Sequence, residues 1–368
     1  MERGKSRTLA ERVPGALDAD WLPRLQASLA PETALIYYVQ RDVETLAWVV
    51  TRTGAAGHRL PLGSRALDGD IATLGAALVR PRDRSEWPPL AERLHAALIE
   101  PLRLERLGVR TLVIVPDGSL NRLPFAALRQ ARTRRFLVED YVLSFAPSGG
   151  FAIASTMRAV ARRAPSRVLA VAVDEASPED GLPPIPAVIE EVRAVALAFP
   201  GTVLLTGAAA TIEGVRRALP GTDVWHFSGH AVANTEYPQL SRLFLSDGGN
   251  GVAPVVAEAL KSLDLANLGL VVLASCSGLE GPLSRSEGIV SLSRAFLLQG
   301  VPTVLVSRWE VDDPDTSRFM SRFYAHLSRG GRPAAALAEA ARESLAADPS
   351  NYAWTAWLLV GGDIGGQP

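Results

Sequence analysis

The second half of the chain alternates short apolar runs with stretches of helical periodicity. The apolar runs lack the every-second-residue polarity of a half-buried strand, and this is typical of strands buried on both faces. Strands are expected at residues 168–173, 202–205, 224–227, 270–274 and 303–306, and helices at 187–199, 211–219, 288–299, 315–328 and 333–347. Alternation at this spacing predicts an α/β/α sandwich with a mainly parallel sheet.

The first half has a different order of elements. Residues 1–30 are charged and irregular, then helical from about Leu17, and are expected to form a linker. Beyond them the pattern predicts a hairpin of strands 34–39 and 45–50, helices 66–80 and 90–107, strands 111–115 and 141–145, and a helix over 148–162. An Arg- and Pro-containing link follows, so the expected domains are 31–162 and 163–368.

Two of the predicted strands end in reactive side chains. The strand beginning at Val224 is followed by Gly229 and His230, and the strand ending at Ala274 is followed by Ser275 and Cys276. Active sites of open parallel sheets lie beyond the carboxyl ends of the strands. If these strands are neighbours, His230 and Cys276 project into one crevice. His230 and Cys276 are 46 positions apart, which suffices for a crossover with an inserted hairpin near 240–247.

A cysteine and a histidine together can hydrolyse peptide bonds. The imidazole takes the thiol proton and later returns it to the leaving amine, and another group must hold the imidazole in the useful tautomer. The developing oxyanion needs backbone N–H donors, for which Gly229, Ala231 and Cys276 are the candidates.

Other interpretations of these residues stay open. Cys276 directly follows an apolar run, so it can equally be a small buried hydrophobe. His226 lies inside its strand and is better explained as structural, although it could support His230 by a hydrogen bond. A histidine pair four residues apart binds metals on a helix face, whereas this segment has the pattern of a strand, so no metal site is expected.

Acidic residues near another strand end have two interpretations. Asp312, Asp313 and Asp315 follow Trp309, and Glu287 precedes the helix expected from Gly288. These carboxylates could cap or stabilise helix N-termini. Alternatively they could line a pocket for a basic substrate residue, since a carboxylate pairs well with Arg or Lys.

Composition narrows the function classes further. The formal net charge is -1, which favours neither nucleic acid nor an anionic membrane as a partner. Cys276 is the single cysteine, which excludes an intrachain disulfide and a cysteine-rich zinc site. No window approaches about 18 uninterrupted apolar residues, and no signal-peptide pattern is found. A cytoplasmic protein is therefore expected. No cofactor is expected either, because thiol–imidazole chemistry requires no metal ion.

Several segments together resemble a known family. The sequence over 31–362 resembles the CHAT domain, a caspase- and separase-related branch of the clan CD cysteine peptidases that is often fused to tetratricopeptide repeats. The resemblance is carried by residues 116–128, 141–148, 226–230, 273–278, 295–297, 300, 309–313, 323–324 and 354–361. Ala231 stands where the family usually has glycine; it keeps the N–H donor but restricts φ.

The resemblance implies a function and a domain arrangement. Cys276 and His230 would be the catalytic dyad of a cysteine endopeptidase acting on specific protein substrates, regulated within a bacterial signalling or defence system. Residues 31–162 would form a degenerate caspase-like domain, and a sensor or repeat-containing protein would be the activating partner. The alternatives are a non-catalytic caspase-like scaffold that binds a partner protein and a thiol-dependent acyl transferase.

Overall fold

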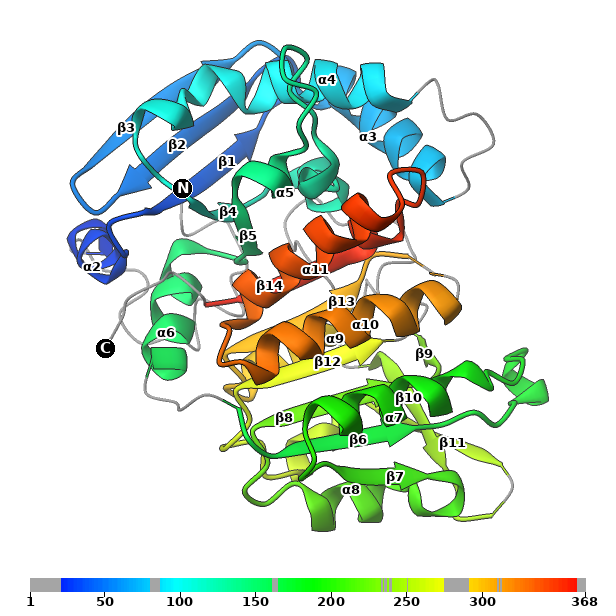
Figure 1. Ribbon diagram of the computed structural model, residues 1–368. Helices are drawn as coiled ribbons and strands as arrows, with labels where there is room; N and C mark the ends of the chain where they lie inside the picture. Colours follow the sequence, from blue (N-terminus) through cyan, green and yellow to red (C-terminus); the bar gives the residue numbers. More distant parts are fainter. Residues whose placement is uncertain are drawn as a thin grey trace. The chain divides into compact units, whose positions relative to one another are not determined.

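The computed structural model describes residues 21–79, 87–160, 165–232, 234, 237, 240–249, 251–274, 291–309, 311 and 313–362. The chain divides into two compact units (Figure 1). The first contains the described part of Met1–Ala161 and of Val360–Pro368, and the second contains the described part of Arg162–Pro282 and Val290–Leu359. Whether the first unit is a degenerate caspase-like domain stays a prediction.

The first unit is built on strands in the order β3-β2-β1-β4-β5. Their bounds are β1 Thr33–Gln40, β2 Thr45–Thr51, β3 Gly54–Leu60, β4 Thr111–Val115 and β5 Val142–Phe145. The predicted hairpin is confirmed, because β1 and β2 pair antiparallel. β3 extends this meander and was not predicted, whereas β4 pairs parallel with both β1 and β5.

Helices accompany this sheet. They are α2 Trp21–Ser28, α3 Ser64–Val79, α4 Trp87–Leu98, α5 Leu137–Asp140 and α6 Gly149–Val160. The helix expected over 90–107 was wrong in its second half, since α4 ends at Leu98 and two short 3-10 turns follow. Pro101 lacks the N–H that a continuing helix needs, and Arg103 has a left-handed φ of 51°.

A tight clamp joins the carboxyl ends of β1 and β4. The Gln40 backbone N–H donates to Asp117 Oδ2 at 2.8 Å. The side chain of Gln40 exchanges two further hydrogen bonds with Ser119, one to its hydroxyl and one from its backbone N–H. Gly118 lies between these contacts with φ of 55°, so the turn after β4 needs glycine.

The second unit has the strand order β14-β13-β12-β8-β6-β7. The bounds are β6 Val168–Ala172, β7 Val203–Thr206, β8 Val224–Ser228, β12 Leu270–Ala274, β13 Thr303–Ser307 and β14 Trp357–Gly361. Neighbouring strands from β7 to β13 pair parallel, which confirms the predicted mainly parallel α/β fold. From β6 the next strand in the chain, β7, is added on one side, whereas β8, β12 and β13 are added on the other side. The strand order therefore reverses between β6 and β8.

Helices cover both faces of this second sheet. They are α7 Ala187–Ala198, α8 Ile212–Ala218, α9 Ser291–Leu298, α10 Asp313–Ser328 and α11 Pro333–Ala347. Successive side chains of a strand point to opposite faces. In β8, Trp225 packs edge-on against Phe296 of α9, whereas His226 packs against Tyr324 of α10. Figure 1 shows α7 and α10 in front of these strands.

A three-stranded insertion separates β8 from β12. It consists of β9 Ala231–Val232, β10 Arg242–Ser246 and β11 Val252–Val256, in the order β11-β10-β9. This agrees with the hairpin expected near 240–247, although the structure extends it to Val256. None of the helices in the described ranges has the length and apolarity to span a bilayer.

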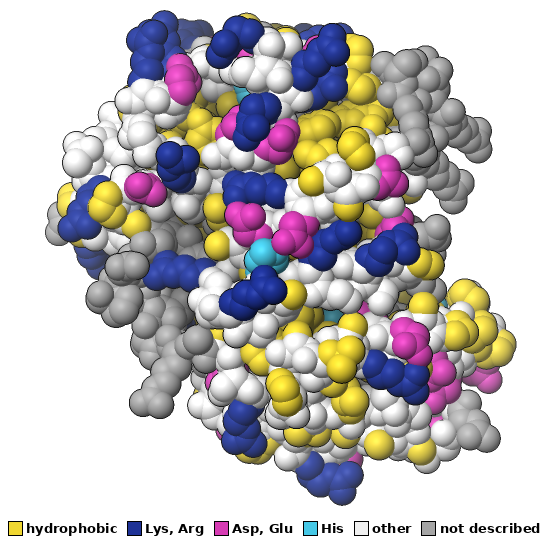
Figure 2. Space-filling view, in the orientation of Figure 1, with side chains coloured by type: hydrophobic (Ala, Val, Ile, Leu, Met, Phe, Trp, Pro, Cys, Tyr) yellow, Lys and Arg dark blue, Asp and Glu magenta, His cyan; other side chains and the backbone are white. Residues whose placement is uncertain are grey.

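Charges of both signs are mixed on the surface. Figure 2 shows Lys and Arg side chains interspersed with Asp and Glu side chains on the face that it displays. This mixture agrees with the formal net charge of -1. The described side chains of that face therefore form no large positively charged area of the kind that binds a phosphate backbone.

We expect Gly118→Ala to destabilise the first unit by about 1–3 kcal/mol. A Cβ there would overlap Gln40 Oε1, and φ of 55° is strained for alanine. Urea unfolding measures the loss. Gly69→Ala is the control, since an added Cβ at that position in α3 would meet nothing within 4 Å, and it should be neutral or slightly stabilising. Equal free energies of unfolding for both variants would contradict the requirement for glycine at position 118.

His95 should make stability depend on pH. It lies in the last turn of α4, and burial lowers its pKa below the usual 6.5 despite the opposing effect of Glu100. At a pH between the lowered pKa of the folded state and the usual 6.5, His95 binds a proton more readily in the unfolded chain than in the folded one. The free energy of unfolding is therefore highest above pH 6.5 and falls as the pH drops towards the folded-state pKa. His95→Gln should flatten this slope in urea unfolding series, whereas His58→Gln in β3 should keep it. An unchanged slope in His95→Gln would refute the assignment.

Candidate functional site

The two strands expected to carry the reactive residues are neighbours. β8 and β12 pair parallel, with Ser228 opposite Ala274 at their carboxyl ends. This confirms the adjacency that the sequence required. His230 follows Ser228 by two positions, and Cys276 follows Ala274 by two positions in the sequence, although Cys276 lies outside the described residues.

The His230 ring is oriented by a backbone carbonyl. Its Nε2 lies 2.6 Å from the Pro183 oxygen, and the side chain is 8% exposed. A carbonyl can only accept, so Nε2 carries the proton of the neutral ring and Nδ1 keeps the lone pair. Pro183 belongs to the loop after β6, and His230 to the loop after β8. Their contact therefore lies where the strand order reverses, which is the usual ligand position in such sheets.

The backbone on either side of His230 is held as well. Its carbonyl accepts from the Phe244 N–H at 3.0 Å. Ala231 lies opposite Leu243 in the antiparallel pairing of β9 and β10. Because the flanking residues His230 and Phe244 are hydrogen-bonded, Ala231 and Leu243 form a non-hydrogen-bonded pair, and the Ala231 N–H makes no hydrogen bond to β10. A Cβ at Gly229 would lie 3.0 Å from Phe227 and 3.3 Å from Val173, which means that the turn between Ser228 and His230 is closely packed.

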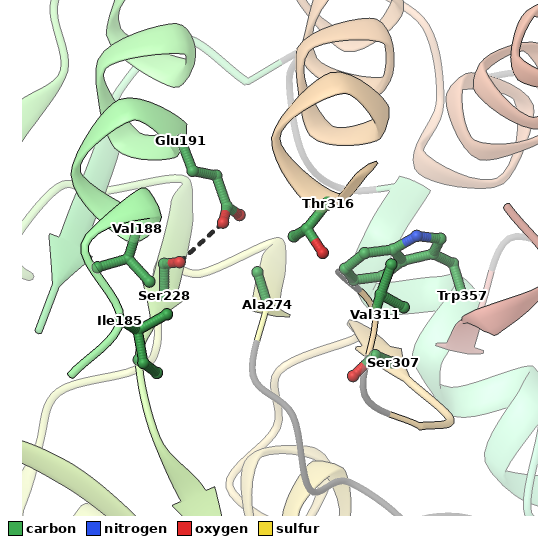
Figure 3. A pocket seen from close by; sticks show the side chains of 10 residues that line it. Ile185, Val188, Glu191, Ser228, Ala274, Ser307, Val311, Thr316 and Trp357 are labelled. Atoms are coloured by element: carbon green, nitrogen blue, oxygen red, sulfur yellow. Dashed lines mark hydrogen bonds between the residues drawn. The ribbon is translucent and has the colours of Figure 1, made fainter. Parts of the chain in front are cut away.

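Beneath this turn lies a buried polar network. The Ser228 hydroxyl donates to Glu191 Oε2 at 2.8 Å, as Figure 3 shows. Glu191 Oε1 lies 3.0 Å from His226 Nε2, close in distance but not aligned as a hydrogen bond. His226 Nδ1 lies 3.0 Å from the Tyr324 hydroxyl. Burial, together with the charge of Glu191, raises the pKa of Tyr324 well above its usual value. The structural interpretation of His226 therefore fits its contacts. The alternative, that His226 supports His230 by a hydrogen bond, is not what the structure shows, since the His230 ring bonds to Pro183.

A small cavity of about 20 Å³ lies between the strand ends (Figure 3). It has room for about one water molecule. Its walls come from the loop before α7, from α7, from the ends of β8, β12 and β13, and from the starts of α10 and β14: Ile185, Val188, Glu191, Ser228, Gly229, Ala274, Ser307, Val311, Thr316 and Trp357.

The remaining candidate residues are only partly placed. Glu287 and Asp312 lie outside the described residues, and Asp313 begins α10 with its side chain likewise outside them. Asp315 Oδ1 accepts from Arg318 at 2.5 Å and from Asn351 at 2.8 Å. Its carboxylate thus ties α10 to the segment before β14. Within the described ranges, no three His, Cys, Asp or Glu side chains gather as a metal site requires.

Two residues of the site were not anticipated from the sequence. Pro183 contributes a main-chain oxygen, which no side-chain pattern can reveal. Glu191 lies in a helix with ordinary amphipathic spacing. The one sequence signal was that a charged residue falls on the apolar face of this helix, together with Val188 and Val195.

Comparisons with known proteins place this arrangement in a family. The model of the CHAT domain matches residues 88–362. Tetratricopeptide repeat protein 28 of Homo sapiens is 27% identical over 77% of this chain, and its Mus musculus counterpart is 27% identical over 78%. The match spans 14% of the length of either relative.

Solved structures agree on the fold. A chain of the Saccharomyces cerevisiae separase–securin complex superposes with a TM-score of 0.59 and 12% sequence identity, covering 97% of this chain and 31% of that chain. A second structure of the same complex gives the same TM-score. The architecture of the described chain is therefore similar to that of separase.

We expect Tyr324→Phe to lower the free energy of unfolding by about 1–3 kcal/mol, because it leaves His226 Nδ1 buried without its partner. Urea unfolding monitors the change. Tyr237→Phe is the matched control, since Tyr237 is half exposed, and it should change little. If both variants lose the same stability, the His226–Tyr324 bond contributes nothing.

Proposed function

From the premise that the chain belongs to the CHAT domain family, we propose that it is a cysteine endopeptidase with Cys276 as nucleophile and His230 as acid and base. The observation that carries the proposal is the register of β8 and β12, which pairs Ser228 with Ala274 two residues before each reactive position. A chain of two residues spans at most about 7 Å, so the proposal requires no large displacement of either loop.

The state of the His230 ring suits this role. With Nε2 donating to Pro183, the Nδ1 lone pair is available to accept the thiol proton. The resulting thiolate attacks the carbonyl carbon of the substrate and forms a C–S bond, while the oxyanion accepts from backbone N–H groups. The Ala231 N–H, outside the β9–β10 ladder, is a suitable donor, and Gly229 and Cys276 are the other candidates.

Two proton transfers complete the reaction. The imidazolium returns its proton to the leaving amine as the C–N bond breaks, which leaves a thioester on Cys276. His230 then takes a proton from water, whose oxygen attacks the thioester. The C–S bond breaks, the carboxylic acid product leaves, and the thiolate accepts the proton again.

The substrate pocket and the partners are extensions of this proposal. Asp312, Asp313 and Glu287 are the carboxylates proposed to bind a basic substrate residue; Asp315 is a weaker candidate because Arg318 and Asn351 already occupy its Oδ1. The relatives' name, tetratricopeptide repeat protein, supports a repeat-containing partner or neighbouring segment. Regulated cleavage in a bacterial signalling or defence system stays a prediction.

The test is cleavage of a diverse fluorogenic peptide library by the wild type, Cys276→Ala, His230→Ala and the control His326→Ala. We expect losses on the order of a thousandfold or more in the first two variants. His326 pairs with Glu343 on the surface, so its variant should cleave normally.

Two results contradict the proposal. One is cleavage that survives the loss of Cys276. The other is a wild type that cleaves nothing and is not labelled at Cys276 by peptidyl chloromethyl ketones, which favours the non-catalytic scaffold.

A further inference from the structure

The buried network under His230 has a role in placing that residue. We propose that Glu191 and Ser228 are positioning residues, whose hydrogen bond fixes the end of β8 and so the point at which Gly229 and His230 leave the sheet. The inference rests on the proposed function, because it concerns how the His230 imidazole is presented to the thiol.

Ser228 is the last residue of β8 and is held from two directions. Its carbonyl accepts from the Val173 N–H at 3.0 Å, and its hydroxyl donates to Glu191 Oε2 at 2.8 Å. The first bond comes from the end of the neighbouring strand, and the second comes from helix α7. Together they fix both the position and the rotation of the residue from which the loop departs.

The turn beyond Ser228 transmits this placement. Gly229 has no free space beside it, since Phe227 and Val173 already lie at contact distance from the position of a Cβ. His230 in turn relies on a 2.6 Å bond from its ring to Pro183 and a 3.0 Å bond from its carbonyl to Phe244. A displacement of Ser228 by about 1 Å would therefore stretch the ring's bond beyond hydrogen-bonding distance.

The composition of the network points the same way. Glu191 is 3% exposed, and an ionised carboxylate in such a place costs several kcal/mol unless it is paired and hydrogen-bonded. The Ser228 hydroxyl donates to one oxygen of this carboxylate, and His226 Nε2 lies 3.0 Å from the other. Apolar side chains would fill the space between α7 and α10 without this cost. A polar set directed at the end of β8 is thus explained by the need to hold that end.

Glu191 acts through Ser228 and not on the substrate. The cavity that Glu191 lines, between Gly229 and Ala274, measures about 20 Å³. That volume suits one water molecule and is too small for a substrate side chain.

The test reads the His230 ring directly, with the full chain labelled with ¹⁵N-histidine and the His230 signal assigned by its absence in His230→Ala. The wild type should show the Nε2–H tautomer. Ser228→Ala should convert part of this signal to the Nδ1–H tautomer and slow alkylation of the single cysteine by iodoacetamide on the order of tenfold. Should Ser228→Ala fail to fold, Tyr324→Phe should shift the tautomer in the same direction by a smaller amount.

Two control variants isolate the effect. Glu191→Gln should stay near the wild type, because its amide oxygen can still accept from the Ser228 hydroxyl. Ser155→Ala removes an equally buried hydroxyl, bonded to the Phe151 carbonyl in α6, and should leave the tautomer and the alkylation rate unchanged.

The outcomes separate this inference from the proposed function. Equal alkylation of the wild type and His230→Ala rejects the dyad, while the tautomer comparison still judges the role of Ser228. A wild-type tautomer and alkylation rate in Ser228→Ala overturn the positioning role. A Glu191→Gln variant with a normal tautomer but altered peptide preference also overturns it, because Glu191 would then contact the substrate.

Discussion

The parallel pairing of β8 with β6 on one side and β12 on the other determines the geometry of the second unit. Parallel strands end at the same edge of a sheet, so three loops emerge together at that edge. The loop after β6 brings Pro183, and the loop after β8 brings His230. Because β8 is buried on both faces, a one-residue shift would turn Trp225 and His226 to the wrong sides, and the register is therefore strongly specified.

The two faces of β8 carry side chains of different chemistry. Trp225 and Phe227 are fully buried apolar side chains, whereas His226 and Ser228 carry a polar network towards α7 and α10. The polar face is therefore continuous with the loop that bears His230. The proposed role of His230 as acid and base would gain from such support, since small misplacements of catalytic groups reduce rates steeply.

The sequence reveals those parts of the molecule whose cause is local. β6, β8, β12 and β13 were predicted because apolar runs buried on both faces are conspicuous; β7 was predicted from the same pattern, although its side chains are largely exposed. β3 was not predicted because Gly54–Leu60 is rich in Gly and Ala and lacks a strand pattern. It forms a strand through its pairing with β2. The helix after Leu90 was drawn too long because helical periodicity continued past Leu98, although Pro101 was present to stop it.

The site follows the same division. The adjacency of the His230 and Cys276 strands follows from general rules of parallel sheets, and it was found. The contact between His230 and Pro183 joins residues 47 positions apart through a main-chain atom, and the Ser228–Glu191 bond joins residues 37 apart. Neither contact produces a periodic pattern in the sequence, because tertiary packing alone brings these groups together.

The partner of the His230 ring has a consequence for the evolution of this chain. A carboxylate in that place could be lost by a single codon change, whereas the oxygen of Pro183 is present whichever amino acid occupies the position. What natural selection must preserve there is the path of the backbone, to which the prolines at 183, 184 and 186 contribute by restricting φ. Drift in the side chains of this loop can therefore proceed while the orientation of the imidazole is retained.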